Sequence, residues 1–452
     1  MTTPSPDNRP LYRRPRILLV IALPLLLWVA GLARIAWPSP ILANISYAML
    51  IGYLLASFPQ IRTSNRILGG ILIAICLALH RGQMPFAVVA RGFEFAVAFC
   101  AFLAVLQFVR ATVEMMPGAT ASRDLFGGMD AVGRRVAILV SCHLLSIVLS
   151  IGAFAIVRPL IPPEEDAEER RRQAVNALRG VCTGIYWSPF TVGIGFIFFT
   201  FPQLPAWQVF GVGMLVAIAI IGSAAVAQGG RRSPAALIAT VQAFRPILAP
   251  LIGATAAVVL TIAFTGLSNL QATIVVMPLF CLYQMQKGGA ERTWRVTSIA
   301  IERMARSGDD MLVFTAAVVL GSILLESRPV LDAMSHVLPP HLPVPVLIGS
   351  LCAIALALGV LGLNAILVGT ILIALSASSA GDLPDMVMAL IVLYGWTAAS
   401  MVSFASLAIL TTGQMFQIDS RKLVWSTNVP FLALVGLANT IALSIAVHLI
   451  RG

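Results

Sequence analysis

The sequence predicts an all-α protein that crosses a membrane repeatedly, with about 11 transmembrane helices and two re-entrant hairpins. Of the 452 residues, 59% are hydrophobic and 11% are charged, and a soluble domain cannot hide that much apolar surface. The apolar residues stand in long runs, separated by short connectors that carry most of the arginines. These connectors account for the formal net charge of +11, so the charge indicates cytoplasmic loops and not a nucleic-acid partner.

The first 92 residues are expected to form a short tail followed by scaffold helices in the membrane. Residues 1–16 contain four arginines and precede an apolar run that has no small-residue cleavage site, so the run is expected to be a retained first span and the tail to be cytoplasmic. Residues 17–92 then supply further scaffold helices, with a basic connector at Arg62 and Arg66. A first repeat is expected over residues 93–230.

The first repeat is expected to contain a re-entrant hairpin over residues 136–157. The connectors before and after it, 110–135 and 158–179, are both rich in arginine, which favours one side of the membrane for both. The segment between them must then enter and turn back, with its tip near Ser146 to Gly152. Ser146, Ser150 and Gly152 are residue types that suit such a tip. The alternative is an ordinary crossing, which would put the second connector outside.

A broken helix is predicted over residues 176–202, because Ser188-Pro189 stands in the middle of an apolar run of membrane length. Proline cannot donate its backbone bond and clashes with the preceding turn. Freed backbone groups at membrane depth are tolerated where protein buries them or a cavity solvates them, so Ser188, Pro189 and Thr191 are expected to line a site. The alternative is a kinked structural helix, since proline is common in membrane helices.

The second half is expected to repeat the first upside down. Residues 231–310 are predicted to form linking scaffold helices, including an amphipathic interfacial segment over 287–308. Residues 311–452 would form the second repeat, with a hairpin over 344–375 that is interrupted at Gly362 and Asn364. A broken helix over 386–415 follows, interrupted at Ser400, Ser403 and Ser406. An odd number of crossings precedes this copy, so it lies upside down relative to the first. The last apolar run, 423–450, is then expected to leave the C-terminus in the periplasm.

Two inverted halves with facing breaks are the arrangement expected of a secondary transporter. Free N–H groups at helix starts suit an anionic substrate, and carbonyl groups at helix ends suit Na⁺. The sequence contains no phosphate-cradling Gly-Lys motif, so coupling to a Na⁺ or H⁺ gradient is favoured over ATP hydrolysis in this chain. Apart from the coupling ion, no cofactor is expected, and the chain is not expected to be an enzyme.

The chain plan from about Phe93 onward resembles the ion transporter superfamily, which includes gluconate and citrate permeases and the large membrane subunit of tripartite periplasmic carboxylate transporters. Ser188-Pro189-Phe190-Thr191-Val192 is similar to the break of that group's first discontinuous helix. The run from Gly362 to Val368 is similar to the tip of its second hairpin, with Ala365 in place of the usual proline. The resemblance implies an elevator-type carrier with a scaffold and a moving transport domain, often a dimer.

The expected substrate-binding residues lie at the two hairpin tips and the two breaks: Ser146, Ser150, Gly152, Ser188, Pro189, Thr191, Gly362, Asn364, Ser400 and Ser403. Each hydroxyl has an alternative role, because serine and threonine in membrane helices often bond the carbonyl of their own preceding turn. Asn364 carries a side-chain amide within an apolar stretch and needs a partner at depth. The six cysteines are isolated and have no metal-ligand spacing.

The expected function is transport of a small organic anion across the bacterial cell inner membrane, by a homodimer surrounded by membrane lipid. One alternative is a membrane-embedded enzyme or envelope-assembly component that modifies a glycan or lipid, which needs carboxylates, histidines or metal ligands gathered at one interface. Another is a passive channel, whose pore would be lined by continuous helices.

Overall fold

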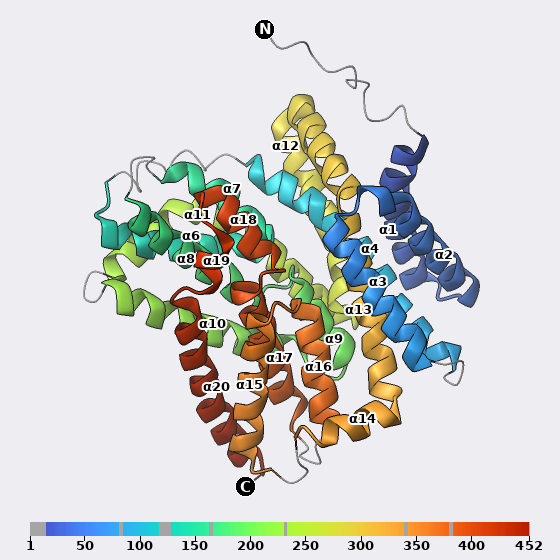
Figure 1. Ribbon diagram of the computed structural model, residues 1–452. Helices are drawn as coiled ribbons and strands as arrows, with labels where there is room; N and C mark the ends of the chain where they lie inside the picture. The colour runs from blue at the N-terminus through green and yellow to red at the C-terminus, as the bar shows by residue number, and fades with distance from the viewer. Residues whose placement is uncertain are drawn as a thin grey trace. The chain divides into compact units, whose positions relative to one another are not determined.

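The computed structural model describes residues 15–80, 85–116, 128–161, 166–229, 233–338, 342–378 and 383–451 (Figure 1). Every regular element within these ranges is a helix. In this part of the chain, nine helical segments have the length and apolar composition that a membrane crossing needs. The described chain is therefore that of a multi-pass membrane protein. Of the predicted tail 1–16, all but the last two residues lie outside the described ranges.

The chain divides into two compact units. Unit 1 comprises residues 1–112 and 273–323, and unit 2 comprises residues 113–272 and 324–452. The helices of unit 1 are α1 (Pro15–Ala36), α2 (Pro40–Ser57), the 3₁₀ turn η2 (Phe58–Gln60), α3 (Thr63–His80), α4 (Phe86–Glu114), α12 (Asn269–Ala305) and α13 (Gly308–Glu326). The last three of these α-helices extend across a boundary between the units.

Unit 1 is held together by close packing of α4 on α13. The rings of Phe99 and Phe314 stack with their centroids 3.8 Å apart. A Cβ atom at Gly92 would lie 2.7 Å from the Cα of Val319, so glycine permits this approach. The segments that follow residues 93 and 311, where the two repeats are predicted to begin, therefore pack together inside unit 1.

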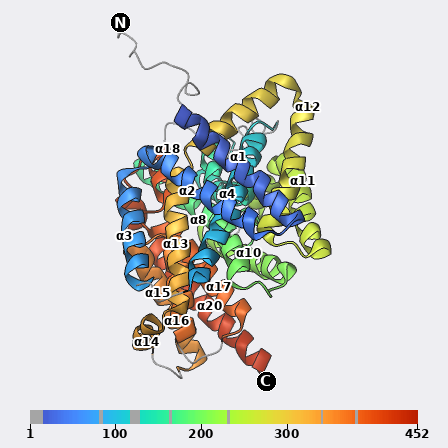
Figure 2. The ribbon, with the colours of Figure 1, turned by 90° about the vertical axis from the view of Figure 1, so that its right-hand side faces the viewer.

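Helix α12 bends sharply at Gly289, which has φ 74° and ψ 178°, a backbone conformation that glycine adopts readily (Figure 2). The part of α12 before the bend is tied to α1 by the Trp28 indole, which donates to the Ile274 carbonyl at 3.0 Å. The part after it is tied to α2 by the Tyr53 hydroxyl, which donates to the Met304 carbonyl at 3.3 Å. The second part carries the arginines of the predicted interfacial segment, and Trp294 on it is 73% exposed.

Unit 2 contains the remaining described elements. In chain order they are α6 (Ala131–Leu149), η3 (Ser150–Gly152), α7 (Ala153–Val157), η4 (Arg158–Leu160), α8 (Ala167–Thr183), η5 (Gly184–Tyr186), α9 (Val192–Thr200), α10 (Ala206–Gly229), α11 (Ser233–Thr265), α14 (Arg328–Ser335), α15 (Val344–Val360), α16 (Ala365–Ser378), α17 (Asp385–Val402), α18 (Leu407–Phe416), α19 (Ser420–Val424) and α20 (Asn428–Arg451).

Helices α6 and α8 run parallel although they are consecutive long helices in the chain. Near their starts, Arg135 of α6 and Glu169 of α8 form an ion pair at 2.8 Å. Near their ends, the Ser188 hydroxyl, just past α8, donates to the carbonyl of Ile147 in α6. The chain between Leu149 and Ala167 must therefore return to the side where α6 began. The turn occurs at Ser150, whose φ is 50°.

Helices α15 and α16 form the corresponding hairpin of the second half, and both pack on α17 (Figure 1). The turn between them, 361–364, contains Gly362 with φ 94°, a left-handed conformation typical of a helix C-terminus. Gly359 of α15 contacts Ala399 of α17, and Ala355 contacts Gly395. The order of these contacts shows that α15 runs parallel to α17, so α16 returns the chain to the side where α15 began.

The parallel course of α6 and α8 predicts that their first residues lie on one side of the membrane. Ala131→Cys and Glu168→Cys, both at exposed positions, should react with an impermeant maleimide from the same side. The six native cysteines are buried, which keeps their background reaction low. Gln203→Cys, which follows α9, should react from the opposite side. Reaction of residues 131 and 168 from opposite sides would contradict the return of the chain at Ser150.

Candidate functional site

Two interrupted helices cross inside unit 2. The first is α8 and α9, interrupted over 184–191, and the second is α17 and α18, interrupted over 403–406. Helix α8 packs on α18, and α9 packs on α17, so the two interrupted helices run antiparallel. Near the crossing, the Thr397 hydroxyl of α17 donates to the Cys182 carbonyl of α8 at 3.4 Å.

The first break is built from Ser188, Pro189 and Thr191. Ser188 is fully buried, and its hydroxyl donates to the Ile147 carbonyl and accepts from the Phe190 amide at 3.2 Å. Thr191 donates its hydroxyl to the Ser188 carbonyl at 2.9 Å. Because this hydroxyl is turned toward the break, it does not cap the start of α9, where Thr191 stands as the N-cap residue.

The Pro189 carbonyl takes its hydrogen bond from a residue 80 positions away in the chain. Asn269, the first residue of α12, is 1% exposed, and its side-chain amide donates to this carbonyl at 3.1 Å. A carbonyl that lies outside helical pairing in an apolar interior needs such a donor. The sequence does not indicate this role for Asn269, because the residue stands at the end of a connector, where asparagine is common in turns.

The predicted tip residues of the first hairpin lie against the first break. Ser146 is buried, donates its hydroxyl to the His143 carbonyl at 2.7 Å, and lies so close to Gly184 that a Cβ there would clash with it. This bond within α6 is the alternative role expected of a membrane serine. Ser150 and Gly152 are half-buried and form the turn itself.

His143 is buried within α6 and meets Trp187 of the first break. The Trp187 indole donates to Nε2 of the imidazole at 3.4 Å, so Nε2 carries no proton in this arrangement. The two rings lie 6.1 Å apart. The imidazole therefore accepts a hydrogen bond from a partner within the interior of unit 2.

The second break is formed by serines without a proline. Ser403 is fully buried and accepts from the Ala405 amide at 3.1 Å. Ser406 donates to the Ser400 carbonyl at 2.6 Å and accepts from the amides of Ala408 and Ile409. Ser406 is therefore the N-cap of α18. Its hydroxyl also takes the place of a backbone donor to the Ser400 carbonyl, near the end of α17.

Gly362 and Asn364 form the turn of the second hairpin. The Asn364 side-chain oxygen accepts from the Ile366 amide at 3.0 Å, and its backbone carbonyl accepts from the Val368 amide at 3.1 Å. Asn364 is half-buried and acts as the cap of α16. The helix that follows thus supplies a hydrogen-bond donor to the side-chain oxygen of Asn364.

The structure brings the predicted residues together in two groups. Ser146, Ser150, Gly152, Ser188, Pro189 and Thr191 form the first, around the first break. In the second group, Ser400 and Ser403 lie at the end of α17, and the Gly359 contact with Ala399 and Val402 brings the turn at Gly362 and Asn364 toward them. The Thr397 to Cys182 hydrogen bond joins the two interrupted helices that carry these groups.

Polar contacts hold α8 against the neighbouring helices. The Arg179 guanidinium donates to Asn428 Oδ1 at 2.8 Å and lies 4.2 Å from the centroid of the Phe431 ring. Asn176 and Gln228 exchange two amide hydrogen bonds of 2.6 Å. At the start of α8, the hydrogen bond from Arg171 lowers the pKa of the Glu168 carboxyl. These contacts fix the helix that leads into the first break.

The fold and the site define a multi-pass membrane protein with two crossed, interrupted helices in one unit. No family model matches the chain, and no curated protein matches it in sequence. Within the described residues there is also no group of three or more histidine, cysteine or acidic side chains placed to hold a metal ion.

Gly180 allows α8 to approach α6, and its substitution should destabilise the unit. A Cβ there would lie 2.3 Å from the Leu139 carbonyl oxygen and 2.8 Å from the Cys142 Cβ. Gly180→Ala should lower the free energy of unfolding by about 1–3 kcal/mol through overpacking. Thermal unfolding in detergent measures the change. Gly222→Ala in α10 is the control, because its new Cβ meets no atom within 4 Å, and it should be neutral or stabilising.

Asn269 should be needed to keep the first break satisfied. Asn269→Ala leaves the buried Pro189 carbonyl without its donor, and should lower the free energy of unfolding by about 1–3 kcal/mol. Gln271→Ala is the matched control: Gln271 Oε1 accepts from the Ser268 amide at the same helix start, but at an exposed site. Equal, small losses in both variants would show that the bond to Pro189 adds no stability.

Proposed function

We propose that this protein is a secondary active transporter that moves a small organic anion across the bacterial inner membrane by an elevator-type mechanism. The observation that carries the proposal is the antiparallel crossing of two interrupted helices in unit 2, each faced by a hairpin. In membrane carriers, such breaks provide backbone groups for a substrate near the membrane midplane.

A constant separation along the chain supports the inverted repeat in this proposal. The contacting residues Cys182 and Thr397 are 215 positions apart. Ser188 and Ser403, in the two breaks, have this same separation, and so do the starts of α9 and α18. In unit 1, the stacked rings of Phe99 and Phe314 also have it. Contacts between a residue and its own counterpart are characteristic of a two-fold relation, as in isologous interfaces.

The division of the chain supports an assignment of roles. Both breaks and both hairpins belong to unit 2, so we assign unit 2 as the part that carries the substrate and unit 1 as the scaffold. The carrier would function as a homodimer within membrane lipid. Its Na⁺ or H⁺ coupling follows from the need for a driving gradient in active transport.

The polarity of the first break supports an anionic substrate. The N-terminus of α9 points its first amides into the break, and the Thr191 hydroxyl bonds the Ser188 carbonyl and leaves these amides without a side-chain cap. The dipole of a helix gives this end a partial positive charge. The second break differs, since Ser406 caps α18.

Transport in reconstituted vesicles tests the proposal. A panel of small carboxylates, offered with an imposed Na⁺ or pH gradient, should give flux through the wild-type protein. Ser188→Ala and Ser403→Ala should each lower the flux about tenfold, because each removes a hydrogen bond of about 1 kcal/mol that holds the backbone of a break in place. The control is Ser322→Ala in α13, a buried serine that bonds its own helix.

The outcomes separate the candidate functions. Flux that depends on a gradient and falls in both break variants, but not in Ser322→Ala, supports the carrier. Equal thermal stability of the three variants would separate this loss from unfolding. Absence of flux across the whole panel, together with modification of a glycan or lipid by the purified protein, would favour a membrane-embedded enzyme.

A further inference from the structure

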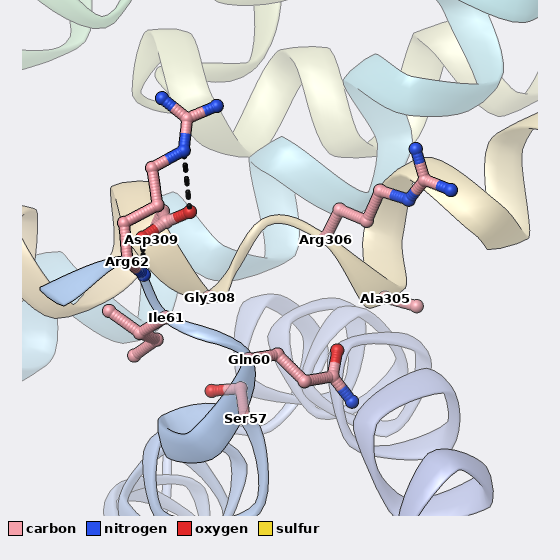
Figure 3. A pocket seen from close by; sticks show the side chains of 8 residues that line it. All are labelled: Ser57, Gln60, Ile61, Arg62, Ala305, Arg306, Gly308 and Asp309. Carbon is pink, nitrogen blue, oxygen red and sulfur yellow. Dashed lines mark hydrogen bonds and ion pairs between the residues drawn. The ribbon is translucent and has the colours of Figure 1, made fainter.

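Unit 1 contains a pocket of about 390 Å³, separate from the breaks of unit 2. It lies between the turn that follows α2 and the junction of α12 with α13 (Figure 3). Gln60 and Arg62 line it from the first of these segments, and Arg306 and Asp309 line it from the second. The proposed transport mechanism uses none of these residues.

The two segments that form the pocket are held together by hydrogen bonds. The Arg62 backbone amide and the Asn65 side-chain amide both donate to Asp309 Oδ1, at 2.8 and 3.1 Å. A Cβ at Gly308 would lie 2.7 Å from the Ser57 Cβ, so the two backbones approach closely there. Arg66 donates to the Ile61 and Pro59 carbonyls and fixes the turn that carries Arg62. The pocket is therefore preorganised.

Two guanidinium groups stand at the mouth of the pocket. Figure 3 shows Arg62 and Arg306 on opposite sides, with the Gln60 side chain below them. The Arg62 Nε lies 3.7 Å from Asp309 Oδ2, and its two Nη groups are directed away from that carboxylate. Arg306 pairs with Glu302 at 2.6 Å on the face of its own helix. Both arginine side chains are more than half exposed, and arginine binds phosphate oxygens with several donors at once.

The Asp309 carboxylate is already neutralised within the pocket. It accepts two hydrogen bonds and has Arg62 beside it. It also stands in the first turn of α13, where the helix dipole favours a negative charge. Arg62 and Arg306 each have one carboxylate beside them, Asp309 and Glu302, so a bound anion would be held by the remaining guanidinium donors and by the Gln60 amide.

The pocket lies where apolar helices end, which is the level of lipid headgroups. Helices α2, α3 and α13 each have the length and composition to cross a membrane, and the pocket stands at the end of α2 and at the beginning of α13. Phe58, next to the pocket turn, is 45% exposed, and Leu55, one helical turn before it, is 69% exposed. Such side chains contact acyl chains when the phosphate of the same lipid lies at the interface.

We propose that this pocket binds the phosphate group of an anionic phospholipid, between the guanidinium groups of Arg62 and Arg306. The cationic connectors that form it carry the positive charge that faces anionic lipids on the cytoplasmic side. A soluble phosphate compound has the same binding chemistry. The exposed apolar side chains beside the pocket favour the lipid.

Lipid binding to the purified full-length chain tests the proposal. Native mass spectrometry would measure the apparent Kd for dioleoyl phosphatidylglycerol, with dioleoyl phosphatidylcholine as the neutral lipid and inorganic phosphate as the soluble anion. Arg306→Gln and Arg62→Gln should each weaken phosphatidylglycerol binding about tenfold, as expected for loss of one charged hydrogen-bond donor. Arg306→Gln leaves the Asp309 bonds in place, so it tests binding without loosening the pocket.

Arg295→Gln is the matched control. Arg295 lies in α12, which ends one residue before Arg306. It pairs with Glu291 at 2.6 Å, four residues away, as Arg306 pairs with Glu302, but it does not line the pocket. It should bind phosphatidylglycerol as tightly as the wild type. If all three variants lose affinity equally, or none does, the pocket is not the site and the proposal fails. If inorganic phosphate competes at the same arginines, the phosphate site stands and its ligand is a soluble anion.

Discussion

Every feature of the proposed site depends on one constraint: a backbone group that leaves helical pairing in an apolar region needs another partner. The first break meets this constraint through side chains of the break itself and of α12. Ser188 bonds the Ile147 carbonyl of α6, Thr191 bonds the Ser188 carbonyl within the break, and Asn269 of α12 bonds the Pro189 carbonyl. The bonds of Ser188 and Asn269 form only when α6, the break and α12 stand in one arrangement. The geometry of the break therefore depends on how these segments pack.

Small residues give these segments room to approach. Apolar side chains gain little by leaving lipid, so association of membrane helices depends on close packing and on bonds between helices. Gly180 and Gly184 admit α6 beside the first interrupted helix, and Gly359 and Gly395 admit α15 and its hairpin beside the second. At each crossing the backbone itself forms the contact surface, which brings a hairpin turn next to a break.

The sequence predicts the local features of this fold well. The proline at 189 and the glycine at 362 act through their own backbone geometry, so the break and the turn at these positions follow from single residues. The interruption at Ser403 was also predicted, from the run of polar residues in an apolar stretch, and Ser406 supplies the cap that makes it possible without proline.

The tertiary partners could not be predicted in the same way. Asn269 and Pro189 are 80 residues apart, and a single asparagine at a helix start gives no sign of a distant carbonyl. The stacking of Phe99 on Phe314 places α4 and α13 together in unit 1, while the order of elements along the chain assigns them to different repeats. Contacts of this kind arise from how helices meet in space, and hydrophobic patterning alone does not specify which apolar faces meet.

The differences between the two halves bear on function more directly than their likeness. After the turn at Ser150 the first hairpin continues with α7, a helix of five residues, whereas the second continues with α16, a helix of 14. In the first break Thr191 leaves the initial amides of α9 without a side-chain cap, whereas Ser406 occupies those of α18. A cap satisfies the same amides that would bind an anion. The uncapped break is therefore the one suited to a negatively charged group, and the capped break is suited to hold α17 and α18 in position. The proposed site would thus have two breaks that share a backbone plan but differ in capping, one suited to bind charge and one suited to support it.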